Sequence, residues 1–146
     1  MPRLLVVHHT PSPLMQVLLE AVREGAALVE DVDLVVRPAL SAGAADLLAA
    51  DGVLLGTPAN IGYMSGALKH FFDIVYYPCL EATAGLPYGV YVHGNDDTAG
   101  ALASIQRITG ALRWKQVAAP LSLTGAPTAG DLDAVRELAA TVAVTL

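Results

Sequence analysis

The chain has 146 residues, 14 acidic against eight basic, and a formal net charge of −6, which leaves no basic stripe to replace the counterions of a nucleic acid. Hydrophobic residues make up 54% of the chain, yet no run of about 18 apolar residues could span a membrane. The apolar stretch at the amino end is too short for a signal peptide, so we expect one cytoplasmic domain over residues 1–146.

Segments typical of strands and of helices alternate along the chain. Short apolar runs predict strands at residues 4–7, 32–36, 52–55, 88–92 and 117–123. Apolar residues at helical spacing predict helices at residues 14–22, 44–50, 64–77, 98–112 and 132–142. Gly25 marks the expected stop after the first helix, and Pro78 is expected to end the third. Pro120 favours an edge position for the last strand.

This alternation predicts an α/β fold with a parallel sheet, right-handed crossovers and helices on both faces. Two arrangements stay open on these grounds, the strand order 2-1-3-4-5 and a Rossmann-type half. In the first arrangement the order reverses between strands 1 and 3, which opens a crevice at their carboxyl ends. The loops after strands 1, 3 and 4 flank this crevice, and they are the strand-following connections richest in Pro, Gly and hydroxyl residues.

The first loop, residues 9–15, opens a helix whose amino end has unpaired N–H groups and a partial positive charge. Such an end suits a phosphate. Thr10 and Ser12 add hydroxyl donors, whereas the loop contains no Lys or Arg. The alternative interpretation is that Ser12 is only an N-cap and Pro13 the favoured first helical residue.

The second loop, residues 57–63, is neutral and longer than a plain strand-to-helix connection needs. Its backbone can meet the edge of a planar polar ring, with Ile61 or Tyr63 on the ring face. The alternative is an ordinary connection with Ser65 as the helix cap. The third loop, residues 93–98, can wrap the other side of the ring, or it is a turn in which Asp97 or Thr98 caps the next helix.

The motifs of several other kinds of functional site are absent from the sequence. There is no G-x-x-x-x-G-K-[ST] motif and no G-x-G-x-x-G motif after the first strand. Ser65 is displaced by one residue from a G-x-S-x-G nucleophile motif. The four histidines lack metal spacing, and only His93 is placed in the crevice. The single cysteine, Cys79, has no evident activating partner, so we expect neither a catalytic side chain nor a metal site.

Residues 56–73, GTPANIGYMSGALKHFFD, resemble the pattern G-[ST]-P-x-x-x-G-x-M-S-x-x-x-K-x-F-x-D of flavodoxin-like flavoproteins, in particular the NAD(P)H-dependent FMN reductase and quinone reductase branch. The matching positions are Gly56, Thr57, Pro58, Gly62, Met64, Ser65, Lys69, Phe71 and Asp73. The first loop is similar to the family's phosphate loop H-S-P-S-G-[HN]-T. The resemblance implies a flavodoxin-like three-layer sandwich with a five-stranded parallel sheet in the order 2-1-3-4-5.

The resemblance also implies that FMN is the cofactor and NAD(P)H the electron donor. The phosphate contacts that it implies are Thr10, Pro11, Ser12, Leu14 and Met15. The contacts implied for the isoalloxazine ring are Thr57, Pro58, Ala59, Asn60, Ile61, Gly62 and Tyr63, and those over its far side are His93, Gly94, Asn95, Asp96 and Asp97. Pro13 stands where the family usually has Gly and Met15 where it has a hydroxyl residue, and both changes weaken the implied phosphate site.

The implied function is transfer of electrons from NAD(P)H through FMN to a quinone, another flavin or a similar small-molecule acceptor. A homodimer is the implied assembly, since this branch commonly associates. Two alternatives stay open. One is a flavodoxin-type electron carrier without NAD(P)H chemistry of its own, and the other is a degenerate module that kept the fold and lost the flavin.

Overall fold

The sheet is built from strands that pair in parallel in the order β2-β1-β3-β5-β6 in the computed structural model, which describes residues 1–146. The strands are β1 (Arg3–His8), β2 (Asp33–Pro38), β3 (Gly52–Asn60), β4 (Tyr63–Met64), β5 (Pro87–His93), β6 (Lys115–Gln116) and β7 (Leu121–Leu123). Both β6 and β7 pair with β5, and the two-residue β4 pairs antiparallel with β3. Apart from this short β4, the order is the predicted 2-1-3-4-5.

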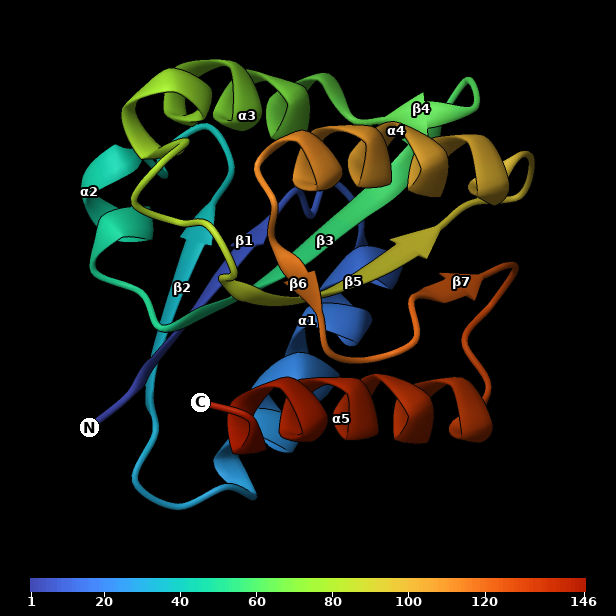
Figure 1. Cartoon of the computed structure of the whole chain (residues 1–146). Helices are drawn as coiled ribbons and strands as arrows, with labels where there is room; N and C mark the ends of the chain where they lie inside the picture. Colours follow the sequence, from blue (N-terminus) through green and yellow to red (C-terminus); the bar gives the residue numbers. More distant parts are fainter.

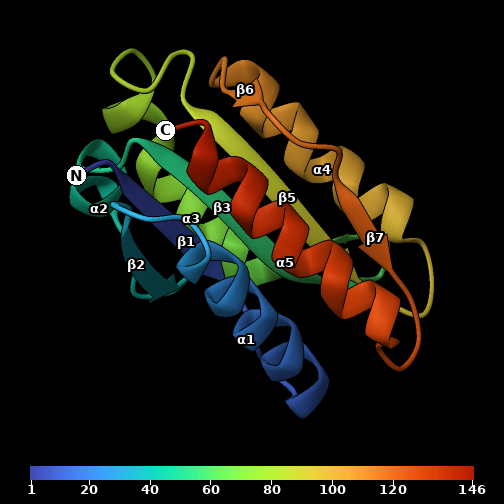
Figure 2. The same cartoon turned by 90° about the horizontal axis from the view of Figure 1, so that it is seen from below.

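Helices cover both faces of the sheet and make a three-layer sandwich (Figure 1). On one face lie α1 (Pro13–Ala27) and α5 (Ala129–Val144), side by side, as the view from below shows (Figure 2). On the other face lie α2 (Ala44–Leu48), α3 (Gly66–Cys79) and α4 (Thr98–Ala111). The predicted fold class is therefore confirmed.

The strands form a covered sheet because they are apolar on both faces. Leu4 and Val6 of β1 are buried with α1 and α5, whereas Leu5 and Val7 are buried with α3 and α4. Alternate side chains of one strand thus enter two separate cores. This double burial accounts for the continuous apolar runs and for the high mean hydropathy of the chain, +0.52.

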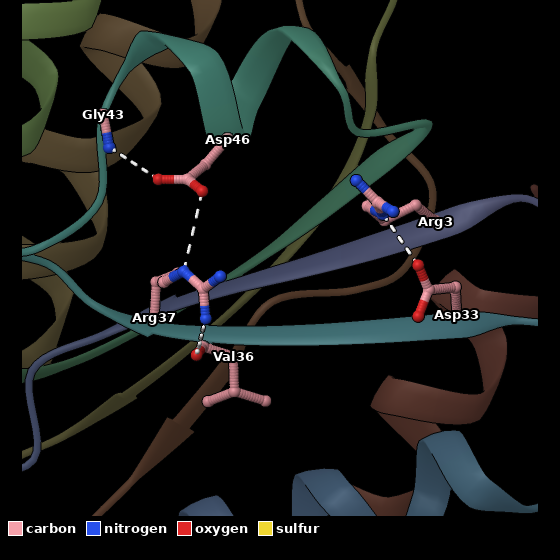
Figure 3. A network of polar contacts seen from close by, with 6 residues as sticks. All are labelled: Arg3, Asp33, Val36, Arg37, Gly43 and Asp46. Atoms are coloured by element: carbon pink, nitrogen blue, oxygen red, sulfur yellow. Dashed lines mark hydrogen bonds and ion pairs between the residues drawn. The ribbon is translucent and has the colours of Figure 1, made fainter.

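Ion pairs link β2, the edge strand of the sheet, to β1 and to α2 (Figure 3). Arg3 Nε lies 2.8 Å from Asp33 Oδ2 and links β1 to β2. Asp46 accepts a hydrogen bond from the Gly43 N–H at 3.0 Å and also pairs with Arg37 at 3.6 Å, which ties the start of α2 to β2. Because most of these side chains are well exposed, each pair adds at most about 1 kcal/mol.

Several element boundaries differ from the sequence predictions. β3 continues five residues past its predicted end, to Asn60, because it pairs there with β4 and β5. Met64 was expected on the third helix and lies instead in β4, although its buried side chain joins the same core. Pro78 lies inside the last turn of α3. The last strand is split at residues 117–120 into β6 and β7, and both parts lie at the sheet edge as predicted.

Gly25 is not a helix stop, since α1 runs on to Ala27. A Cβ atom at Gly25 would collide with the backbone of Arg136 in α5. The glycine therefore permits close approach of the two helices, and its role depends on a segment more than a hundred residues away in sequence.

We predict that Gly25→Ala destabilises the fold by about 1–3 kcal/mol, since overpacking between α1 and α5 outweighs the gain in helix propensity. The matched control is Gly110→Ala in α4, where a Cβ atom meets nothing within 4 Å. That variant should gain roughly 0.5–1 kcal/mol. Urea unfolding of both variants is the measurement, and equal stabilisation of the two would show that the helices do not need this close contact.

Candidate functional site

The three predicted loops meet at one edge of the sheet because the strands before them run parallel. His8 at the end of β1 pairs with Gly56 of β3, and Pro58 of β3 pairs with His93 at the end of β5. The connections that follow these strands therefore leave the same carboxyl edge, where β4 also lies (Figure 1). The candidate ligand site lies among these connections.

The first loop ends in the amino terminus of α1. Ser12 is the N-cap, as the alternative interpretation had it, and its Oγ accepts a hydrogen bond from the Met15 N–H at 3.2 Å. The backbone N–H groups of Thr10, Ser12 and Leu14 have no acceptor within the chain. Free N–H donors at and just before the amino end of a helix suit an anion, and the Ser12 cap leaves these three N–H groups available.

Met15 takes part in this loop only through its backbone. Its side chain is 1% exposed and packs in the core beneath α1 and α5. The thioether therefore cannot meet a phosphate at the loop. This burial also explains why an apolar residue stands at a position where the resemblance implied a hydroxyl.

The second loop is a β-hairpin. Residues 57–60 continue β3, and Ile61 and Gly62 turn the chain into β4 with φ of 52° and 68°. Two successive positive φ angles fit a tight two-residue hairpin turn. Thr57 is buried and its Oγ1 accepts from the Ser65 N–H at 3.0 Å, which fixes the hairpin to the start of α3. Ser65 caps α3 by accepting from the Leu68 N–H at 3.2 Å.

The third loop caps α4 and touches the hairpin. Asp97 is the N-cap, and its Oδ1 accepts from the Gly100 N–H at 3.0 Å. A Cβ atom at Gly62 would collide with Asp97 Oδ2, and one at Gly100 would collide with the carbonyl oxygen of Gly62. The absence of both side chains lets the two loops close together.

A hollow of about 600 Å³ lies between the hairpin and the third loop. Its lining residues are Ala59, Ile61, Gly62, Asn95, Asp96 and Asp97. Asp97 is held by the cap, whereas the carboxylate of Asp96 is exposed and makes no hydrogen bond. The volume is within the range of small-molecule sites, and two carboxylates make the rim acidic.

His93 lies outside this hollow, contrary to its expected place in the crevice. Its Nε2 is 2.8 Å from the Gly125 carbonyl oxygen, in the connection between β7 and α5. By alternation along β5 it shares the face of Tyr91, whose side chain is packed with α1 and α5. The histidine thus links the end of β5 to the connection that precedes α5.

Residues 15–128 match the family model described as NADPH-dependent FMN reductase. The chain belongs to this family. A flavodoxin of Aquifex aeolicus (strain VF5) is 35% identical over 75 residues, a segment that is 51% of this chain and 40% of that protein. The matched segment thus spans less than half of the length of this relative.

Solved flavodoxin structures share the fold over nearly the whole chain. The WrbA-like flavodoxin from Agrobacterium tumefaciens superposes with a TM-score of 0.81 at 21% identity and covers 99% of this chain and 97% of its own. A flavodoxin from the domain Archaea gives 0.84 at 17% identity, covering 98% and 97%. Flavodoxin 2 from Bacillus cereus gives 0.82 at 19% identity, covering 99% of both chains. At these identities the likeness establishes the fold alone.

The cofactor of this family is FMN, and the residues at the carboxyl edge fit it. The free N–H groups at the start of α1 suit its phosphate, and the hollow is large enough for a planar ring. His9, in the same loop, has a buried Nδ1 atom without a hydrogen-bond partner. Such an orphaned polar atom is typical of a site completed by a ligand or water.

Other sites are not indicated. No group of three or more His, Cys, Asp or Glu side chains is placed to hold a metal ion. Cys79 is buried, and this burial raises the pKa of its thiol, which keeps it protonated and unreactive. None of the helices combines the length and the apolar character required to cross a bilayer.

We predict that Pro13→Ala tightens FMN binding, since it returns a backbone N–H to the first turn of α1. Hydrogen bonds to charged groups contribute about 1.5–3 kcal/mol, so we expect a gain of roughly tenfold in affinity. Quenching of flavin fluorescence measures it. Riboflavin, which lacks the phosphate, is the control ligand, and an equal gain for riboflavin would place the effect elsewhere than at the phosphate.

Proposed function

We propose that this chain is an oxidoreductase in which FMN, bound at the carboxyl edge, passes electrons from NAD(P)H to a quinone, another flavin or a similar acceptor. The observation that carries the proposal is the hollow between the hairpin and the third loop, at the same carboxyl edge of the sheet as the free N–H groups at the start of α1. Membership of the NADPH-dependent FMN reductase family supports it.

The proposed contacts divide between the two ends of the cofactor. The N–H groups of Thr10, Ser12 and Leu14 and the nearby hydroxyls would hold the phosphate. Residues 58–63 of the hairpin and residues 94–97 would hold the ring. Thr57 and His93 would act indirectly, because their side chains are engaged within the protein.

Bound FMN supplies the hydride and electron chemistry. The chain positions the ring and sets the charge around it, and no side chain is needed to carry a proton in the hydride step. The ionisable groups that line the hollow are Asp96 and Asp97. Ile61 is fully exposed at its rim, so its side chain is available to pack on the face of a planar ring.

A second candidate function is electron carriage between proteins. The similarity to a flavodoxin over 75 residues and the acidic rim at Asp96 and Asp97 favour it. A net charge of −6 would suit docking to a basic partner.

The deciding experiment adds FMN to the purified protein, follows flavin fluorescence, and then adds NADPH without oxygen. We expect quenching, because the ring becomes packed against the hairpin, followed by loss of the yellow flavin colour. Free FMN at the same concentration is the control for reduction outside the protein. Quenching without bleaching by NADPH or NADH would reject the reductase function and favour the carrier.

We also predict that Asp96→Asn raises the midpoint potential of the bound flavin. A carboxylate beside the ring opposes the negative charge gained on reduction, so its removal should raise the potential by on the order of tens of millivolts. Asp96 is the informative position because Asp97 also caps α4. Spectroelectrochemical titration is the measurement.

The matched control is Asp31→Asn, which removes the same charge just before β2. This position lies at the amino ends of the strands, away from the carboxyl edge. Asn tolerates the positive φ of 60° at this position. The control should leave the potential unchanged. Equal shifts in both variants would mean that net charge, rather than a carboxylate beside the ring, sets the potential.

A further inference from the structure

His8 is a buried histidine placed directly beneath the phosphate loop. It is the last residue of β1, 8% exposed, and its Nδ1 lies 2.7 Å from the Thr10 hydroxyl oxygen. By alternation along β1, its ring shares the face of Val6, on the side of α1 and α5. The contact therefore joins the sheet to the first residues of the loop that leads into α1.

The neighbours of His8 in the sheet fix this position. His8 pairs with Gly56, which in turn pairs with Tyr91, so the three residues form one row across β1, β3 and β5. Gly56 has no side chain, and the ring of Tyr91 fills the space above it. The histidine therefore lies in the same row, and on the same face of the sheet, as an aromatic residue that is itself fully buried.

The donors available to a phosphate in this loop are few. The loop contains no Lys or Arg, Pro11 and Pro13 have no N–H, and the Met15 N–H is bound to Ser12 Oγ. The hydroxyl proton of Thr10 therefore matters, and a threonine hydroxyl has only one. A phosphate dianion is purely an acceptor, so Thr10 helps to bind it only if this proton points toward it.

The proton on His8 decides which way the Thr10 hydroxyl points. If Nδ1 is unprotonated, it must accept the Thr10 proton, and Thr10 then presents only lone pairs to the phosphate. If Nδ1 carries a proton, it donates to Thr10 Oγ1, and the Thr10 hydroxyl is free to donate outward. Burial, with Arg23 and His9 acting in the same direction, lowers the pKa of His8 and so favours the neutral ring, which has two tautomers.

We propose that His8 is a positioning residue for phosphate recognition: its Nδ1–H donates to Thr10 Oγ1 and directs the Thr10 hydroxyl proton onto the phosphate of FMN. The pair lets the chain distinguish FMN from riboflavin without a cationic side chain in the loop. This proposal rests on FMN binding at the carboxyl edge, as described above.

The test compares affinities for FMN and riboflavin by fluorescence quenching in four proteins: wild type, Thr10→Val, His8→Phe and His8→Asn. We expect the FMN preference to fall about tenfold in Thr10→Val and in His8→Phe, with little change in riboflavin affinity. In His8→Asn the amide NH₂ stands the same number of bonds from the backbone as Nδ1, so it can donate to Thr10 and should retain the preference. Failure of this rescue, or an unchanged preference in His8→Phe, overturns the proposal.

A measurement on the unaltered protein avoids any effect of substitution on folding. Long-range ¹H–¹⁵N correlation of the imidazole rings reports which nitrogen of His8 is protonated. In the FMN complex we expect a protonated Nδ1, and an unprotonated Nδ1 with a protonated Nε2 overturns the proposal. If the wild-type protein binds neither flavin, the proposed FMN site is rejected. If it binds both flavins and its preference for FMN does not depend on His8, only the proposed role of His8 is rejected.

Discussion

The whole structure depends on β1 pairing in parallel with both β2 and β3, because this arrangement sends the chain to opposite faces of the sheet. α1, which follows β1, covers one face, and α3, which follows β3, covers the other. The connections that leave these two strands therefore diverge, and the space between them opens at the carboxyl edge. The residues that we assign to FMN lie on the connections that leave this edge after β1, β3 and β5, so strand order alone brings these connections to one edge of the sheet.

Backbone geometry then sets the shape of the hollow. Gly62 and Gly100 let Asp97 cap α4 while it touches the hairpin. Ile61 breaks two local preferences at once, since a β-branched residue stands at a φ of 52° and is fully exposed. A left-handed conformation costs such a residue roughly 1–2 kcal/mol, and exposure of its side chain brings no compensation. Positions of this kind are expected at functional sites, which agrees with the place of Ile61 at the rim.

Apolar runs and helical spacing are local signals, so they predicted the alternating strands and helices and the helices on both faces of the sheet. They left two strand orders open, and the resemblance of residues 56–73 favoured the order 2-1-3-4-5 that the structure has. Ser12, Ser65 and Asp97 could be considered as caps for the same reason. Features that depend on residues distant in sequence were not predicted. Gly25 has the local pattern of a helix end, but its role comes from its contact with α5. The His93 side chain is hydrogen-bonded to the Gly125 carbonyl oxygen, 32 residues later. Trp114 gave no local signal either, yet it packs on Phe72 and Tyr88, and its Nε1 donates to Thr83 Oγ1 at 2.9 Å.

The residues that match the family model and the residues that would hold the phosphate of FMN lie in largely different parts of the chain. The family match begins at Met15, the last residue of the loop that would hold the phosphate, and it includes the hairpin and the third loop that form the hollow. The loop that we propose for the phosphate has two prolines, no cation and three free N–H groups, so each donor would account for a large share of the attraction there. Substitutions within residues 8–14 can therefore change how tightly FMN is held while the ring site stays the same.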